Sequence, residues 1–368
     1  MGETFRDCRA IDDKFLTELH TGKLKSFVDF IKTHDDLELC FRGNRAEGAQ
    51  AITIYKNNHI VWDIETKDFA NYKIHISFNH ARYSENWKEI KKRLVDLKFA
   101  DKKLTKDGIK KLSYKVNKSV SKEFVEASYK LVMEFMGNFF DFSTRTNNNR
   151  QADDYFKREI NPIDLKSRKS FLVEKIKQQD LFSRALNGKG MYYAYDLEFS
   201  QKHNSNSTGN QPDMLAIKSE NGKNKLCLIE VKSKKNACDQ DGSGVVDHLV
   251  GMVKYIDAII EGQAVIDNRK IEAHKIIESY KRLGIHSSKI DLSKNPINGI
   301  EIMFIFTDTH IDSEYKYDIS KNSKDVPATK WIADAKNQAR LKQEIAKYPK
   351  VEFSFKTYID GQLNDVII

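Results

Sequence analysis

The sequence is short of cysteine and of long apolar runs, and each shortage excludes a class of protein. Its 368 residues hold four cysteines without a CxxC pair, too few and too scattered for a disulfide-built secreted domain or a zinc cluster. No run of about 18 apolar residues is present to cross a membrane. The first residues, MGETFRDCRAIDD, lack the apolar core of a secretion signal. These absences predict a cytoplasmic protein with reduced thiols and no membrane partner.

Positive charge is what the chain has in excess. Lysine and arginine number 62 against 53 aspartates and glutamates, so the formal net charge is +9. A basic surface favours polyanions, above all nucleic acid. Apolar residues make up 40% of the chain, enough for a core, and its length predicts about two domains. A nucleotide-binding glycine loop is missing, which argues against an ATP-driven motor.

The first part of the chain predicts an α+β unit. Residues 13–34 repeat apolar side chains at helical spacing, and helical spacing returns over residues 87–140. Between them, four segments alternate apolar and polar residues as strands do: 37–41, 51–55, 60–64 and 72–78. A turn-rich spacer joins the second and third strands into a hairpin. We therefore expect an N-terminal domain, residues 1–150, with an antiparallel sheet.

A lysine-rich segment lies inside this first domain. Nine lysines fall between residues 98 and 122. Two interpretations stay open, a solvated surface and a patch that contacts phosphates. The later stretch 144–151 has no apolar residue and indicates a linker, so we place the domain boundary near residue 150.

The second part of the chain, residues 151–368, predicts an α/β core. A helix over 167–186 is followed by three strands, then by helices over about 246–260 and 271–283, and then by another strand. The predicted strands are 191–199, 214–217, 225–232 and 300–306. The centre of the third strand is apolar on both faces, which is typical of an internal strand. The order is helix, three strands, helix, strand.

Charged residues interrupt two of these apolar strands. Glu230 and Lys232 stand two residues apart, so their side chains share one face of the sheet. Asp213 opens the preceding strand, and pairing of the two strands can bring it beside Glu230. Two neighbouring carboxylates repel each other unless a cation lies between them, and carboxylate oxygens suit Mg²⁺. A nearby lysine can position water and stabilise charge on a phosphate, so these residues together predict phosphodiester hydrolysis.

Pro212-Asp213, followed by Glu230-x-Lys232 at the end of an apolar strand, resembles the PD-(D/E)XK nuclease superfamily. The resemblance covers roughly residues 160–310 and includes the order of the elements. It implies a restriction-endonuclease-like core. It also implies that Asp213 and Glu230 bind Mg²⁺, for which Mn²⁺ can substitute, and that Lys232 serves the attacking water.

Other positions of that family correspond less directly. Many members add a glutamate from the first core helix, for which Glu174 is the candidate. Many also have a polar residue, often glutamine, on the later helix and a tyrosine about two turns on, where this sequence has His248 and Tyr255. A solvated helix charge is the alternative for Glu174, and a packing or capping histidine is the alternative for His248. His310, beyond the last strand, is a weaker candidate.

The sequence thus predicts a Mg²⁺-dependent endonuclease, with DNA favoured over RNA. Restriction or anti-phage defence is a setting suggested by family analogy alone. The N-terminal domain would bind substrate, recruit a partner protein or form a homodimer. Two other functions stay open: a nucleic-acid-binding protein without catalysis, and an interaction protein whose nuclease-like half is a scaffold.

Overall fold

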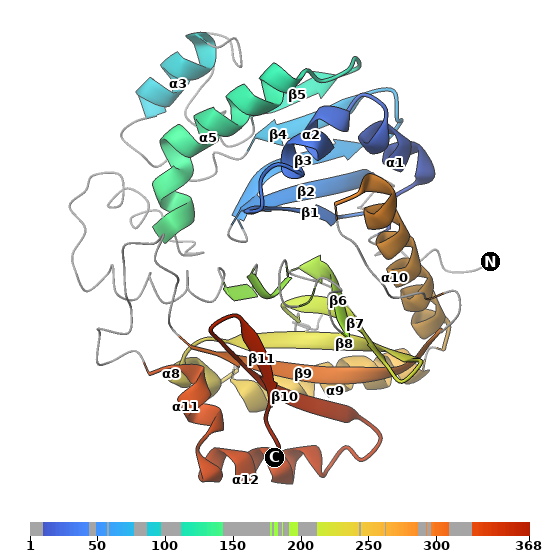
Figure 1. Cartoon of the computed structure of the whole chain (residues 1–368), viewed down its shortest axis with the longest axis vertical. Coiled ribbons are helices and arrows are strands. Elements are labelled where there is room, and N and C mark those ends of the chain that lie inside the picture. The colour runs from blue at the N-terminus through green and yellow to red at the C-terminus, as the bar shows by residue number, and fades with distance from the viewer. Residues whose placement is uncertain are drawn as a thin grey trace. The chain divides into compact units, whose positions relative to one another are not determined.

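The computed structural model describes residues 10–43, 49–56, 59–76, 87–96, 112–142, 177–178, 180–182, 186, 191–197, 212–242, 244–261, 263–285, 292, 296–308 and 326–368. The chain forms two compact units, Ile11–Leu172 and Val173–Ile368, the latter joined by Met1–Ala10 (Figure 1). The boundary predicted near residue 150 lies outside the described residues and stays a prediction.

The unit Ile11–Leu172 is built on a five-stranded antiparallel sheet, sheet A. Its strand order is that of the chain, β1 (Leu37–Phe41), β2 (Gln50–Lys56), β3 (His59–Thr66), β4 (Tyr72–Ile76) and β5 (Ser113–Val116). The first four confirm the predicted strands. The fifth was not predicted, because it lies in the lysine-rich segment, where alternation is carried by Tyr114 and Val116 between charged and polar residues.

Helices α1 (Asp13–His20), α2 (Lys25–Ile31), α3 (Trp87–Asp96) and α5 (Lys122–Phe142) complete this unit. The single helix predicted over 13–34 is wrong, since the chain turns between α1 and α2. At Gly22 a Cβ atom would come within 2.8 Å of Glu18 Cα, so the turn requires glycine. The core lies where α2 and α5 meet sheet A. There the buried Trp62 ring packs against Phe27, at 5.4 Å between centroids, and its Nε1 donates to Ser128 Oγ.

The unit containing Val173–Ile368 is built on a six-stranded mixed sheet, sheet B. Its strand order is β11-β10-β9-β8-β7-β6. Strands β6, β7 and β8 pair with one another in antiparallel fashion. Strands β8, β9 and β10 pair in parallel, and β11 pairs antiparallel to β10. The strands are β6 (Tyr192–Leu197), β7 (Met214–Glu220), β8 (Lys223–Lys232), β9 (Ile297–Thr307), β10 (Glu352–Ile359) and β11 (Gln362–Asp365).

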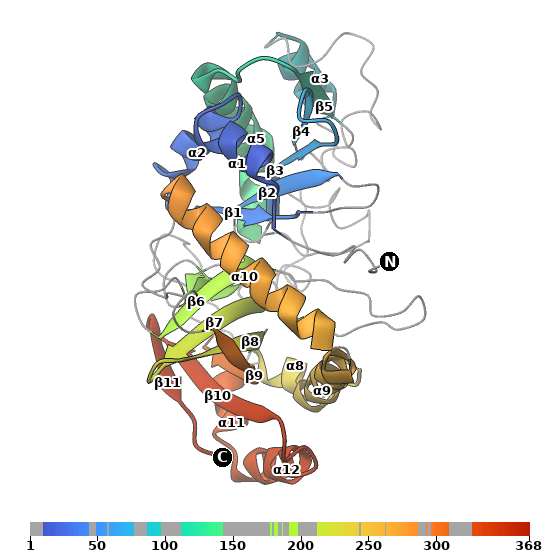
Figure 2. The ribbon, with the colours of Figure 1, turned by 90° about the vertical axis from the view of Figure 1, so that its right-hand side faces the viewer.

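Five helices of this unit are described: α8 (Lys235–Cys238), α9 (Val245–Glu261), α10 (Gln263–Leu283), α11 (Ala328–Ile332) and α12 (Ala335–Ile345). Helix α9 lies on one face of sheet B in both views (Figures 1 and 2). The predicted strands β6 to β9 and the helices α9 and α10 are confirmed. The elements α11, α12, β10 and β11 were not predicted. Most of the helix predicted over 167–186 lies outside the described residues.

A tight turn sets the register that positions the candidate site. Asn221 and Gly222 both have positive φ, 50° and 72°, which suits a two-residue hairpin turn between β7 and β8. The turn pairs Glu220 with Lys223 and carries the register on to Met214 opposite Ile229. Strand β8 is buried along most of its length between β7 and β9, as its apolar composition predicted.

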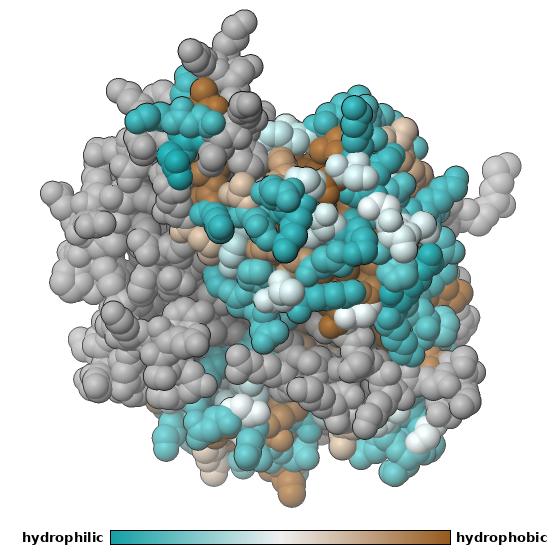
Figure 3. Space-filling view, turned by 45° about the horizontal axis from the view of Figure 1, so that its top comes forward, coloured by the Kyte–Doolittle hydropathy of each residue, from teal (hydrophilic) through white to brown (hydrophobic). Residues whose placement is uncertain are grey.

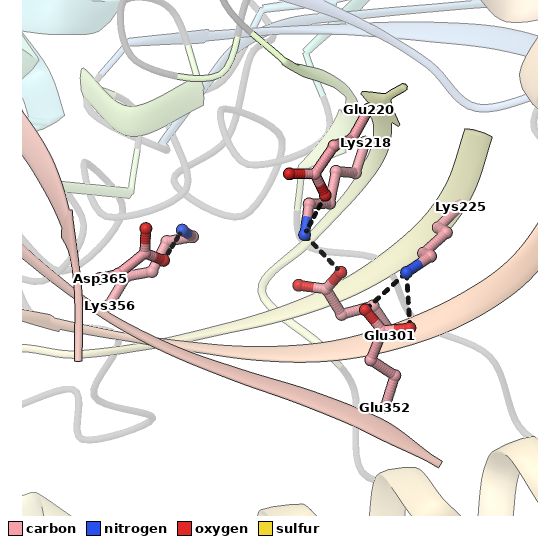
Figure 4. A network of polar contacts seen from close by, with 7 residues as sticks. All are labelled: Lys218, Glu220, Lys225, Glu301, Glu352, Lys356 and Asp365. Atoms are coloured by element: carbon pink, nitrogen blue, oxygen red, sulfur yellow. Dashed lines mark hydrogen bonds and ion pairs between the residues drawn. The ribbon is translucent and has the colours of Figure 1, made fainter. Parts of the chain in front are cut away.

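Ion pairs join the strands on the face of sheet B opposite to Glu230 (Figure 4). Lys218 Nζ lies 3.2 Å from Glu301 Oε2, which ties β7 to β9. Lys225 lies 2.6 Å from Glu352 Oε1, and Lys356 pairs with Asp365. Glu301 is fully buried, and the Lys218 ammonium compensates its carboxylate.

The surface shown in Figure 3 is mainly hydrophilic, with apolar areas of small extent among the described residues. Among the helices of the described residues, none has both the length and the apolar composition needed to cross a bilayer.

Candidate active site

Asp213 and the end of strand β8 lie together, as their pairing predicted. Asp213 stands directly before β7, and its Oδ2 accepts a hydrogen bond of 2.8 Å from the backbone N–H of Val231. Since Val231 separates Glu230 from Lys232, this bond fixes the Asp213 carboxylate at the part of β8 that carries both predicted residues. The proximity is therefore observed, while the catalytic roles stay predictions.

Glu230 is the most enclosed member of the group. Its side chain is 3% exposed, and its Oε1 accepts a hydrogen bond of 2.8 Å from Lys232 Nζ. His248, from the first turns of α9, places Nδ1 2.7 Å from the same oxygen. The second oxygen, Oε2, is buried without a hydrogen-bond partner within the described part of the chain. Lys232 and His248 thus compensate the charge on Oε1, whereas no described residue compensates the charge on Oε2.

The charge of Glu230 follows from these neighbours. Burial raises the pKa of Glu230, but the Lys232 ammonium and His248 outweigh it, so the pKa lies below its usual value. The carboxylate is therefore ionised at neutral pH and can only accept. A buried, ionised oxygen without a donor is unfavourable, and a bound cation would compensate it.

The described residues fit a hard divalent cation in part. Asp213 and Glu230 supply carboxylates from adjacent strands, and Mg²⁺ commonly takes one or two carboxylates and completes its shell with water and substrate phosphate. Over the described ranges, no group of three or more His, Cys, Asp and Glu side chains is arranged to hold a metal. Asp213 and Glu230 would therefore hold such an ion together with water, substrate or a further side chain.

Several predicted positions cannot be placed. Glu174 and His310 lie outside the described residues, and Tyr255 lies in α9 with its side chain outside them. His248 is different, because the structure brings it against Glu230. This contact is more than the packing or capping alternative predicted, and the role of His248 stays a prediction.

A second polar group, which was not predicted, lies at the same end of the sheet. Lys177 Nζ lies 2.8 Å from Asp308 Oδ1, just after β9 ends, and Tyr358 donates to Asp180 Oδ2 near the end of β10. These contacts hold Lys177 and Asp180 against the ends of β9 and β10. Asp308 follows an apolar strand much as Glu230 and Lys232 end one, and that position was the available signal.

The start of α9 is fixed by its own loop. The backbone N–H of Gly242 donates to Asp247 Oδ2 at 2.8 Å, and His248 N donates to Gly244 O at 3.0 Å. The loop therefore sets where the first turn of α9 begins, and with it the position of the His248 ring.

No protein-family model, curated protein or solved structure matched the chain when it was compared with them. The functional argument consequently rests on the residues and their geometry.

Proposed function

We propose that this protein is a divalent-metal-dependent nuclease with a restriction-endonuclease-like core in the unit containing Val173–Ile368. The observation that carries the proposal is the buried, ionised Glu230, whose Oε2 lacks a partner within the described residues while Asp213 and Lys232 lie beside it. Two carboxylates and an ammonium at the end of paired strands suit phosphodiester hydrolysis.

The proposed roles follow from the contacts. Asp213 and Glu230 would hold Mg²⁺ or Mn²⁺, which when bound polarises a phosphate oxygen and lowers the pKa of water. Lys232 would donate a hydrogen bond to the attacking water and would stabilise the negative charge that develops on the phosphate oxygens. His248 would orient Glu230 by facing its Oε1, so that Oε2 points to the cation.

The arrangement of the strands supports the same core. An antiparallel β6-β7-β8 meander, then α9 and α10, then β9 parallel to β8 reproduce the predicted order after the first helix. The net charge of +9 favours a nucleic acid, and we take DNA as the preferred substrate. Action in the cytoplasm, in restriction or anti-phage defence, is part of the proposal and rests on analogy.

Cleavage of supercoiled plasmid by the purified full chain tests this function. The reaction is run with Mg²⁺, with Mn²⁺ and with EDTA, for the wild type, Lys232→Ala and Lys225→Ala. Lys225 lies on the same strand, on the opposite face, and is the matched control. We expect metal-dependent nicking or linearisation that Lys232→Ala loses and Lys225→Ala keeps. If plasmid and a labelled single-stranded RNA both stay intact with every metal, the proposal is wrong.

A nucleic-acid-binding protein without catalysis is the second candidate. It is favoured by the way Lys232 and His248 already compensate Glu230 Oε1 without a metal. Asp213→Ala separates the two functions, because it abolishes cleavage by a nuclease and leaves the affinity of a simple binding protein unchanged.

A further inference from the structure

The helices α11 and α12 carry an excess of positive charge. Residues 326–350 contain six lysines and arginines and two acidic residues, Asp334 and Glu344. All six basic side chains are exposed: Lys330, Lys336, Arg340, Lys342, Lys347 and Lys350. Leu341 is the fully buried residue of α12, so its apolar side faces the protein and its charged side faces solvent.

This basic surface is attached next to the candidate active site. The backbone N–H of Ala328 donates to Ser233 O at 3.1 Å, and Lys235 N donates to Val326 O at 2.9 Å. The segment that leads into α11 therefore runs beside the residues that follow Lys232, and α11 lies next to α8 (Figure 1).

Packing fixes α11 at this position. The buried Trp331 ring stacks on Phe306, with 5.8 Å between centroids, and Phe306 is the register partner of Lys232 in β9. Arg340, in α12, lies 3.4 Å from Asp239 in the loop that leads to α9. The α11–α12 surface is thus held against β9 and against the segment that joins β8, which carries Lys232, to α9, which carries His248.

Most of the positive charges on this surface lack an ion-pair partner among the described residues. Arg340 pairs with Asp239, and Lys347 lies 2.6 Å from Glu344. The other four have no ion pair within the described part of the chain: Lys330, Lys336, Lys342 and Lys350. Lys336 and Arg340 are also four residues apart on one helix, where like charges repel. An anionic ligand would relieve this repulsion.

We propose that α11 and α12 bind the phosphate backbone of the nucleic acid next to the site where it is cut. The inference rests on the proposed function in taking nucleic acid as the ligand, and adds the surface that binds it. Helix α12 has 11 residues and so spans about 16 Å, close to five phosphates of one strand at 3.4 Å each along the axis. Its exposed side has no large apolar residue for insertion into a bilayer.

Binding is measured without cleavage, by fluorescence anisotropy of a labelled 20-base-pair DNA duplex with the full chain in EDTA over a series of NaCl concentrations. The variant changes four lysines to glutamine: Lys330→Gln, Lys336→Gln, Lys342→Gln and Lys350→Gln. The control removes the same charge from four exposed lysines elsewhere, Lys32→Gln, Lys130→Gln, Lys223→Gln and Lys275→Gln. Circular dichroism checks that both variants fold as the wild type does.

Each phosphate contact contributes about 0.9 to the slope of log K against log salt for duplex DNA. We expect the variant to lose about 3.6 from this slope and about tenfold or more in affinity, while the control stays within about twofold of the wild type. The inference is overturned if the slope is unchanged, if the control falls equally, if the wild type binds no DNA at low salt, or if it binds vesicles of anionic lipid in preference.

The plasmid assay keeps the two proposals apart. Cleavage by the wild type with an unchanged slope in the variant would refute the binding surface and leave the nuclease. A reduced slope in the variant, with neither plasmid nor single-stranded RNA cleaved by the wild type, would leave the binding surface and refute the nuclease.

Discussion

At the scale of single residues, Glu230 concentrates the chemistry of the candidate site. Its Oε1 faces two basic groups, Lys232 and His248, and its Oε2 is buried without a partner among the described residues. This asymmetry would be costly in an inert core and is useful at a cation site. Asp213 also has a structural role, because it accepts a hydrogen bond from the backbone N–H of Val231.

Two substitutions of Asp213 separate its hydrogen bond from its charge. In Asp213→Asn the amide oxygen can still accept from Val231, so we expect the free energy of unfolding to stay within about 1 kcal/mol of the wild type. Asp213→Ala leaves that N–H without its acceptor and should cost about 1–3 kcal/mol. Urea denaturation measures both. Each variant should lose plasmid cleavage, and an active Asp213→Asn protein would show that the charge is not needed.

Lys232→Met tests whether a cation can replace the lysine. In EDTA the buried Glu230 would keep His248 as its one basic neighbour among the described residues, so we expect a loss of about 3–5 kcal/mol in the free energy of unfolding. Mn²⁺ should restore part of this loss, because it supplies the missing positive charge. Urea denaturation with EDTA and with Mn²⁺ gives the comparison. Equal stability of the variant under the two conditions would contradict a metal at Glu230.

At the scale of elements, sheet B carries the candidate active site on one face and an ion-pair network on the other. Figure 4 shows the network. The pairs in that network differ in exposure. The side chains of Lys218 and Glu301 are 13% and 0% exposed, whereas those of Lys225 and Glu352 are 27% and 46% exposed. Burial decides how much each pair contributes, since solvent screens an exposed pair.

Lys218→Met should destabilise the protein far more than Lys225→Met. The first change leaves the fully buried Glu301 carboxylate without its ammonium, at a cost of about 3–5 kcal/mol. The second breaks a screened pair and should cost about 1 kcal/mol or less. The midpoints and slopes of urea denaturation give both values. Equal effects would mean that Glu301 is neutralised in another way.

Buried titratable groups on the same face of sheet B predict that the free energy of unfolding falls at alkaline pH. Burial, followed by the Glu301 charge, raises the pKa of Cys227 well above its ordinary 9.0, and burial also raises the pKa of Tyr192. Burial lowers the pKa of Lys218, but Glu301 and Glu220 outweigh it and the net shift is upward. In each case the unfolded chain releases its proton at a lower pH than the folded chain, so the free energy of unfolding falls as the pH rises above 9.0.

Cys227→Ala isolates one contribution to this alkaline loss. The variant no longer has a thiol that ionises only in the unfolded state. We expect its free energy of unfolding to fall less steeply between about pH 9.5 and 10.5, by up to about 1.4 kcal/mol per pH unit. Urea denaturation at several pH values measures the slope, which removes any constant cost of the smaller side chain. Parallel slopes would show that Cys227 ionises equally in both states.

Local patterns explain which elements the sequence could predict. Strands β7 and β8 were predictable because their apolar runs flank Asn221-Gly222, and that turn determines the register that brings Asp213 to Val231. The His248 contact was not, since it depends on how α9 crosses sheet B. Strand β5 and the turn at Gly22 were missed because lysines mask the alternation of the first, and helical spacing continues through the second.

At the scale of the whole molecule, two sheets divide the chain into units with separate cores. Asp213, Glu230, Lys232 and His248 all belong to the unit containing Val173–Ile368. The function of Ile11–Leu172 is therefore open to a separate test, and the lysines of its β5 region, Lys115 and Lys118, are exposed.

A fragment of residues 11–142 should fold by itself, because sheet A, α1, α2 and α5 enclose the buried Phe27 and Trp62 within one compact unit. We expect one cooperative urea transition by circular dichroism and by tryptophan fluorescence. The fragment should not cleave plasmid, since it lacks the candidate site. If it binds DNA with a salt dependence that Lys115→Gln with Lys118→Gln reduces, the phosphate-patch interpretation of the lysine-rich segment holds. If it folds and binds no DNA, that interpretation is wrong, and partner recruitment becomes the function to test for this unit.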